Sequence, residues 1–247
     1  MRYLLQLAYK GTSYHGWQKQ HNALSVQAVL EEKLSLMLGE NIETLGCGRT
    51  DTGVHAKDFY AHFDTSRAFD LNRIVYKINQ LLPDDIAAIK LFEVAADFNA
   101  RFDASNRSYQ YWITRKPNPF LVNQAWYQYG ELDIEKMNMA AGLLIGKKDF
   151  QCFSKVHTQV DNFICDVSFA QWEIKEDKLV FSITANRFLR NMVRAIVGTL
   201  MEVGKGKLTL HEVQQILESK NRNEAGQSVP ACGLYLTKIT YPQLLQK

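Results

Sequence analysis

Residues 48–53, Gly-Arg-Thr-Asp-Thr-Gly, place a single carboxylate, that of Asp51, between two glycines and close to Arg49. Flanking glycines permit turn conformations that other residues avoid, and the two threonines offer hydroxyls that can orient the carboxylate. Two interpretations fit these residues. One is an active-site loop built around Asp51. The other is a hairpin turn with a solvated aspartate, because Asp and Gly are among the commonest turn residues.

Three arginines form a second group that suits the binding of an anion. Arg187, Arg190 and Arg194 are spaced three and four residues apart. A long helix is predicted from a cap at Asn186 to Gly204, and this spacing puts the three arginines on one face of it, opposite the apolar stripe. That face is either a phosphate-binding surface or a solvated basic face, since such charge patterns are common on helices.

Arginines and aromatic rings alternate in a third segment, residues 98–111, which includes Arg101, Arg107 and Tyr109. Aromatic rings stack on bases and arginines bind phosphates in a bidentate manner, so the combination suits an extruded nucleotide. Strand aromatics are more often part of the core, and we expect Phe98 and Phe102 to be buried. Tyr109 fits either role.

The hydrophobic pattern predicts elements that position these three segments. Strands and helices alternate in both halves of the chain: strands at 2–10, 86–94, 109–113, 167–175, 178–185 and 233–241, and helices at 25–39, 70–81, 133–144, 186–204 and from the Thr209/Glu212 capping box onward. No linker rich in Pro, Gly or Ser separates the halves. We therefore expect an α+β protein with subdomains 1–105 and 106–247 packed across a cleft.

Bulk composition narrows the class of protein. The chain has 247 residues, 46% of them hydrophobic, and a net charge of +3, which by itself does not indicate nucleic acid. With neither a long apolar run nor a signal peptide, we expect a cytoplasmic protein that does not enter a membrane. The four cysteines lie far apart, which predicts buried thiols and neither zinc nor disulfides. His55 and His62 are interpreted as structural, because no third metal ligand accompanies the pair His62 and Asp64.

Several motifs in fixed order identify a family. The chain resembles the TruA family of tRNA pseudouridine synthases over nearly its whole length, on the motifs Tyr14–Gln20, Gly48–Asp51, Gly53–His55, Ala100–Phe102 with Tyr109, Met192–Arg194, Leu200–Gly204 and Gly233–Leu236. The resemblance implies isomerisation of uridine to pseudouridine at tRNA positions 38, 39 and 40, in the anticodon stem-loop. It also implies a homodimer, and two mostly antiparallel sheets with helices on one face, joined across a central RNA-binding cleft. Neither a cofactor nor a metal is implied.

Residue roles follow from the same resemblance. Asp51 matches the catalytic aspartate, Tyr109 the tyrosine that packs against the target base, Arg194 the arginine that pairs with the aspartate, and Arg49 the residue that helps to extrude the base. These roles are physically consistent, because a positive partner within a few ångströms favours a charged carboxylate. Further RNA contacts are expected from basic and aromatic positions of the three segments and the N-terminal motif: Arg101, Arg107, Arg187, Arg190, His15 and Lys19.

Some positions depart from the family pattern. Thr52 stands where alanine is frequent, Asn99 replaces a frequent histidine, and residues 155–166 lack an arginine that many members have. These changes put local RNA contacts in doubt and leave the catalytic residues in place. Two other classes of protein remain as alternatives. One is a tRNA-binding module or chaperone without chemistry, and the other is a carboxylate-dependent nuclease or nucleoside hydrolase.

Overall fold

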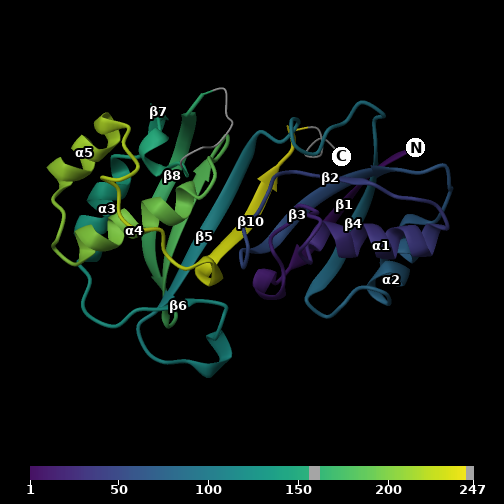
Figure 1. Ribbon diagram of the computed structural model, residues 1–247, viewed down its shortest axis with the longest axis horizontal. Helices are drawn as coiled ribbons and strands as arrows, with labels where there is room; N and C mark the ends of the chain where they lie inside the picture. Colours follow the sequence, from purple (N-terminus) through teal and green to yellow (C-terminus); the bar gives the residue numbers. More distant parts are fainter. Residues whose placement is uncertain (156–161, 243–247) are drawn as a thin grey trace. The chain divides into compact units, whose positions relative to one another are not determined.

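The computed structural model describes residues 1–155 and 162–242, with all their side chains except that of Asn72. The chain forms two compact units, one made of Met1–Ser105 and the residues from Tyr235 onward, the other of Asn106–Leu234 (Figure 1). The expected subdomains, 1–105 and 106–247, differ from these units in the last strand. That strand pairs in parallel with a strand of the first unit, Tyr235 opposite His55, and so groups with it.

The first unit contains a mostly antiparallel sheet in the strand order β4-β1-β3-β10, with the short β2 paired to β3. Its strands are β1 (Arg2–Tyr9), β2 (Thr44–Gly46), β3 (His55–Asp64), β4 (Ile86–Val94) and β10 (Leu234–Thr240). Consecutive leucines of β1, Leu4 and Leu5, are both buried, as is Leu7. Because neighbouring residues of a strand point to opposite faces, both faces of the sheet are covered at β1.

Two helices belong to this unit, α1 (Val26–Leu38) and α2 (Leu71–Asn79), together with the 3-10 turn η1 (Gly11–Ser13). The hydroxyl of Ser25 accepts a hydrogen bond from the Ala28 amide and caps α1, and Gly39 ends the helix in a left-handed conformation. The helix predicted at 25–39 is therefore confirmed.

The second unit contains an antiparallel sheet in the order β5-β9-β8-β7, with β6 parallel to β5. Its elements are β5 (Asn106–Thr114), η2 (Pro119–Leu121), β6 (Trp126–Tyr127), α3 (Ile134–Gly142), β7 (Gly146–Asp149), η3 (Gln151–Phe153), β8 (Ile164–Lys175), β9 (Lys178–Ala185), α4 (Met192–Gly204), α5 (Leu210–Ser219) and η4 (Ala231–Gly233). The capping box predicted from Thr209 and Glu212 begins α5. The α+β prediction is confirmed.

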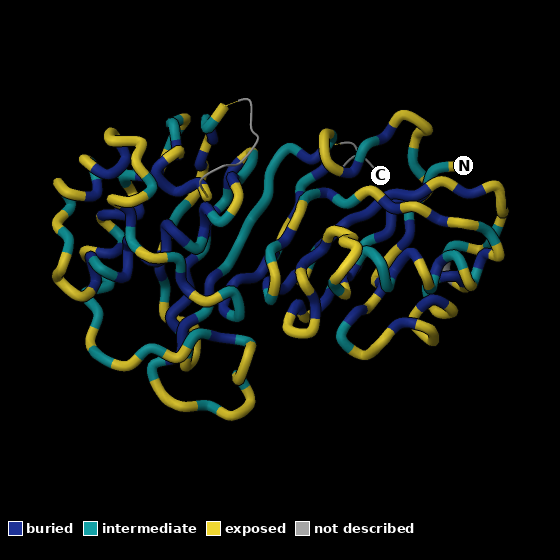
Figure 2. Tube along the Cα trace, in the orientation of Figure 1, coloured by how far each residue is buried: buried dark blue, intermediate teal, exposed yellow. Residues whose placement is uncertain are grey.

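The core of the second unit lies on one face of this sheet. Tyr111, Phe181 and Trp172 are opposite one another on three neighbouring strands, and all three are nearly fully buried. Every residue of α4 is buried except Arg194 and Glu202. A helix that is apolar almost all round is a central element of its unit. Figure 2 shows that many buried residues of each unit lie along its strands and helices, and that many exposed ones lie in the connecting loops.

Three expectations are corrected. The long helix begins at Met192 and not near Asn186, because Asn191 takes a left-handed conformation with φ +66° just before it. Phe102 is 75% exposed, although Phe98 is buried as expected. Of the four cysteines, Cys232 is half-buried, and the other three are buried.

No helix within the described residues is long and apolar enough to cross a membrane.

Candidate functional site

Asp51 lies in a tight turn just before β3. The amide of Val54 donates to the Asp51 carbonyl oxygen at 3.1 Å, which closes the turn. The neighbouring Thr50 is held on two sides: its carbonyl accepts from the Trp17 amide at 3.3 Å, and its hydroxyl is 2.9 Å from the hydroxyl of Tyr9. Thr50 is buried and Asp51 half-buried, so the carboxylate is carried by a backbone that the core of the unit fixes.

The segment 11–17 packs directly against this turn. Gly16 has φ +86°, and a Cβ there would overlap the carbonyl oxygen of Thr50. On the other side of Asp51, a Cβ on Gly11 would overlap the carbonyl of Val54. The Gly11 amide also donates to Nδ1 of His55 at 3.0 Å. Only glycine allows this close approach of two backbones, so residues 11–17 form the frame that orients Asp51.

The sequence predicted RNA contacts for His15 and Lys19 and did not indicate that residues 11–17 hold the Asp51 turn. The signal that could have found it is the pair Gly11 and Gly16, since glycine often marks close backbone approach. His15 is exposed, and its amide donates to the Leu24 carbonyl at 2.9 Å. Lys19 is also exposed, and its ammonium is 3.2 Å from a carboxylate oxygen of the buried Glu31.

The other predicted residues of the first unit are two exposed arginines. Arg49 precedes Asp51 by two residues and is exposed. Arg101 lies in a turn that the side chain of Asn99 closes, where its guanidinium covers the ring of Phe102 at 5.4 Å. Both arginines are exposed at the surface of this unit.

In the second unit, the first half of β5 carries two of the predicted residues on one face. Arg107 and Tyr109 alternate with residues of the opposite face, and Tyr111 continues the row. The half-buried ring of Tyr109 meets the ring of Phe188 edge to face at 5.1 Å. Arg107 donates from Nη1 to the Asn186 carbonyl at 2.9 Å. The structure thus brings β5 and residues 186–188 together around Tyr109.

Arg194 lies in the first turn of α4 and is half-buried. Its Nε donates to the Val229 carbonyl at 2.7 Å. The next carbonyl, that of Pro230, accepts from the hydroxyl of Tyr111 at 2.7 Å. Arg194 and the β5 residue Tyr111 therefore donate to neighbouring carbonyls, those of residues 229 and 230. Burial raises the pKa of Tyr111 above its ordinary range, with a smaller opposing effect of Arg194.

The prediction that Arg187, Arg190 and Arg194 share one helix face is wrong. Arg187 and Arg190 precede α4, in the irregular segment after β9, because the left-handed Asn191 separates them from the helix. Arg187 is half-buried, and Arg190 is exposed with its carbonyl accepting from the Lys155 amide at 3.0 Å. Residues 156–161, part of the stretch that lacks the family's arginine, lie outside the described residues.

The histidines act as hydrogen-bond acceptors within the core. Nδ1 of His62 accepts from the Ala100 amide at 3.1 Å, and burial, with the charge of Arg2, lowers the pKa of His62. The ring of His55 stacks on that of Tyr235 with centroids 4.7 Å apart. Across residues 1–155 and 162–242, no three His, Cys, Asp or Glu side chains are grouped as metal ligands. The rings of His55 and His62 are both buried and each accepts a hydrogen bond from a backbone amide.

Comparison with known proteins gives the family. The model of the family described as tRNA pseudouridine synthase matches residues 140–242. A tRNA pseudouridine synthase A from Bacteroides thetaiotaomicron is 47% identical, over 98% of this chain and 91% of the relative. Relatives of the same name from Bacteroides fragilis and Clostridium acetobutylicum are 46% and 41% identical, over 98% and 96% of this chain and 97% and 98% of theirs. The chain therefore belongs to the tRNA pseudouridine synthase A family.

Proposed function

We propose that this protein converts uridine to pseudouridine at positions 38, 39 and 40 in the anticodon stem-loop of tRNA, with Asp51 as the catalytic carboxylate. The observation that carries the proposal is the Asp51 turn, fixed by Thr50, Gly11 and Gly16, in a chain related over nearly its whole length to tRNA pseudouridine synthases. A catalytic carboxylate must be held within a fraction of an ångström, and such a frame supports that demand.

The reaction breaks the bond between uracil N1 and the ribose and forms a bond from uracil C5 to the same ribose carbon. A proton leaves C5 and one is gained at N1, so the reaction needs no redox change and adds no water. Positive charge develops on the sugar as the first bond breaks, and a carboxylate can attack or stabilise that centre, as in glycoside hydrolysis. Asp51 has this role.

The remaining residues meet the needs of a substrate that is paired in a helical stem. Extruding the uridine costs a few kcal/mol, which stacking on an aromatic ring, worth about 1–3 kcal/mol per base, can offset. Tyr109 supplies that ring, and Arg49 fills the space that the base leaves. Arg194, which the family resemblance matches to the arginine that partners the catalytic aspartate, supplies a positive charge of the kind that favours an ionised carboxylate.

Phosphates of the tRNA are bound by basic and polar residues of both units, namely Arg101, Arg107, Arg187, Arg190, His15 and Lys19. The protein acts in the cytoplasm as a homodimer. Two chains together present twice the net charge of +3 that one chain presents to the RNA.

Replacing Asp51 tests the proposal. Asp51→Asn and Asp51→Ala are expected to abolish pseudouridine formation on an unmodified tRNA transcript while tRNA affinity stays within about twofold, since the carboxylate contributes no attraction for phosphate. Asp84→Asn is the matched control, because Asp84 is an exposed aspartate of the same unit.

Near-normal turnover by Asp51→Asn would refute the role of Asp51. The two other classes predict different products: a tRNA chaperone leaves uridine unchanged, and a nuclease or nucleoside hydrolase yields cleaved RNA or free uracil in a chelator-sensitive reaction.

A further inference from the structure

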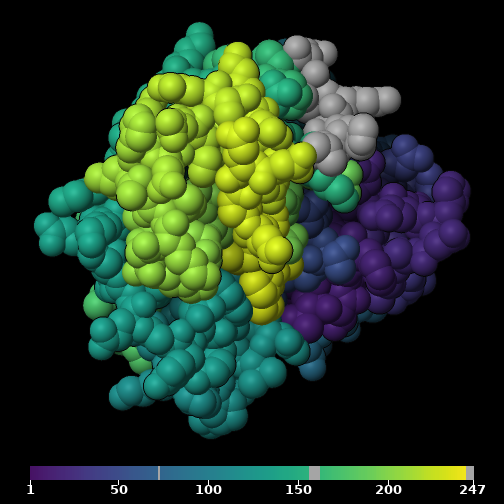
Figure 3. Space-filling model, turned by 60° about the vertical axis from the view of Figure 1, so that its left-hand side comes forward, coloured from purple at the N-terminus to yellow at the C-terminus, as the bar shows by residue number. Residues whose placement is uncertain are grey.

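The segment 222–229, which follows α5, lies along α4 in the opposite direction. Its Gly226 amide donates to Oγ1 of Thr199 at 2.9 Å, and three residues later the Val229 amide donates to the Arg194 carbonyl at 3.3 Å. Between these bonds a Cβ on Gly198 would overlap the carbonyl oxygen of Gln227. Figure 3 shows, in yellow-green and yellow, the surface formed by the last part of the chain, which includes this segment.

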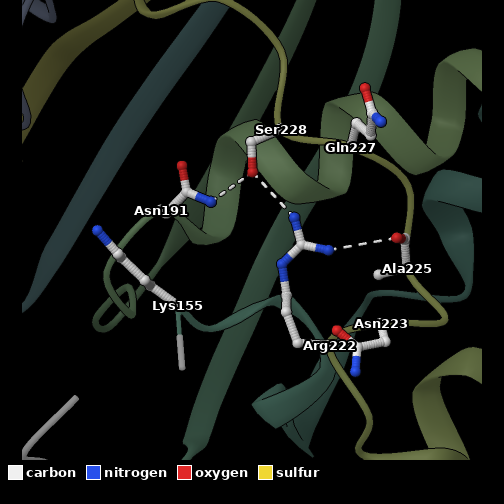
Figure 4. A pocket seen from close by; sticks show the side chains of 7 residues that line it. All are labelled: Lys155, Asn191, Arg222, Asn223, Ala225, Gln227 and Ser228. Carbon is white, nitrogen blue, oxygen red and sulfur yellow. Dashed lines mark hydrogen bonds between the residues drawn. The ribbon is translucent and has the colours of Figure 1, made fainter. Parts of the chain in front are cut away.

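One side chain, that of Arg222, closes this segment into a loop. Nη1 of Arg222 donates to the carbonyls of Ala225 at 3.2 Å and Gly226 at 3.1 Å, and Nη2 donates to the hydroxyl of Ser228 at 2.9 Å (Figure 4). The planar fork of an arginine suits several acceptors in one plane, whereas a lysine offers a single point donor. Arg222 thus fixes three groups spread over four residues.

The closed loop is tied to the start of α4 through Ser228. Nδ2 of Asn191, the left-handed residue before the helix, donates to the Ser228 hydroxyl at 2.5 Å (Figure 4). One hydroxyl oxygen therefore joins Asn191 to Arg222. Both residues line the pocket shown in Figure 4.

Val229 comes directly after Ser228 and is the residue that binds Arg194. The two make a reciprocal pair, amide to carbonyl at 3.3 Å and Arg194 Nε to the Val229 carbonyl at 2.7 Å. Val229 is buried, so its carbonyl has little freedom once Ser228 is fixed. A guanidinium bound through Nε keeps its four Nη hydrogens for other acceptors, and the position of the Val229 carbonyl sets their direction.

We propose that Arg222 is a positioning residue for the reaction: it fixes the segment that ends at Val229 and thereby orients the guanidinium of Arg194. This inference rests on the proposed function, in which Arg194 is a catalytic residue. A misplacement of about 1 Å in a catalytic group can cost on the order of 100-fold in rate, so a residue remote from the substrate can control turnover.

Steady-state kinetics on an unmodified tRNA transcript test the proposal with Arg222→Met, Arg222→Lys and Ser228→Ala. We expect kcat to fall about 10- to 100-fold for both Arg222 variants, and less for Ser228→Ala, with KM for tRNA within about twofold. Arg73→Met, which removes an exposed arginine of α2, is the control and keeps both constants. Circular dichroism establishes whether each variant is folded. If Arg222→Met does not fold, Ser228→Ala still tests the proposal, because it removes one of the hydrogen bonds of Arg222.

A double-mutant cycle with Arg194→Met separates positioning from a general structural role. If Arg222 acts through Arg194, the double variant Arg194→Met/Arg222→Met is no slower than Arg194→Met alone. The inference would be overturned if the fold-losses in kcat of the two single variants multiplied in the double variant. It would also be overturned if Arg222→Met or Ser228→Ala were folded and had an unchanged kcat. Near-normal turnover of Arg194→Met would instead refute the proposed role of Arg194, and the positioning role with it.

Discussion

Replacing Gly198 by alanine measures how closely the segment 222–229 is held against α4. Gly198 lies inside α4, where a Cβ would overlap the carbonyl oxygen of Gln227 and come within 3.0 Å of its carbonyl carbon. These are backbone atoms, so no side-chain rotation can relieve the overlap. The segment must move away from the helix, and it then loses its bonds from Gly226 to Thr199 and between Val229 and Arg194.

The size of the effect follows from opposing contributions. Alanine gains about 1 kcal/mol over glycine inside a helix. Overpacking costs about 1–3 kcal/mol, and each hydrogen bond lost costs about 1 kcal/mol. With three hydrogen bonds lost, the free energy of unfolding should therefore fall by about 3–5 kcal/mol, which lowers Tm by about 6–20 °C in a chain of this length.

Urea and thermal unfolding, followed by circular dichroism, provide the measurement. Gly142→Ala is the matched control, since Gly142 also lies in a helix of the second unit but nothing lies within 4 Å of its Cβ. It should raise the free energy of unfolding by about 0.5 kcal/mol. If Gly198→Ala were as stable as Gly142→Ala, the close approach of the segment to α4 would be refuted.

Two further predictions concern buried titratable groups. Burial lowers the pKa of His62 from 6.5, so the unfolded chain binds a proton at this site before the folded one does, and the free energy of unfolding should fall as pH drops below about 6.5. In urea titrations between pH 5 and 7, His62→Gln should reduce the dependence of the free energy of unfolding on pH. An unchanged dependence would contradict the lowered pKa of His62. Burial also raises the pKa of Cys152 to about 12 and that of Cys165 to about 11. Both thiols should resist a disulfide reagent at pH 8 in the folded protein and react in urea, and fast reaction of either in the native state would count against the buried core described above.

Features that depend on a few neighbouring residues were predictable from the sequence. Ser25 caps α1, and the Thr209 and Glu212 pair begins α5, because each cap is a hydrogen bond between residues three apart. The motifs that occur in fixed order along the chain, from Tyr14–Gln20 to Gly233–Leu236, likewise indicated the family.

The features that could not be predicted from the sequence depend on contacts between residues far apart in the chain. The frame of the Asp51 turn depends on Gly11 and Gly16, some forty residues away in the chain, and the hold on Arg194 depends on Val229. The start of α4 was misplaced because an asparagine in a left-handed conformation looks, in sequence, like any other polar helix residue. Such contacts are set by the packing of the whole unit and leave no periodic signal.

Mapping pseudouridine in an unmodified tRNA transcript after incubation with the purified protein is the most direct test of the proposed function. Carbodiimide derivatisation followed by primer extension locates each modified position. Modification is expected at positions 38, 39 or 40 with the wild-type protein and none with Asp51→Asn. Pseudouridine confined to sites outside the anticodon arm, or unchanged uridine throughout, would contradict the proposed function.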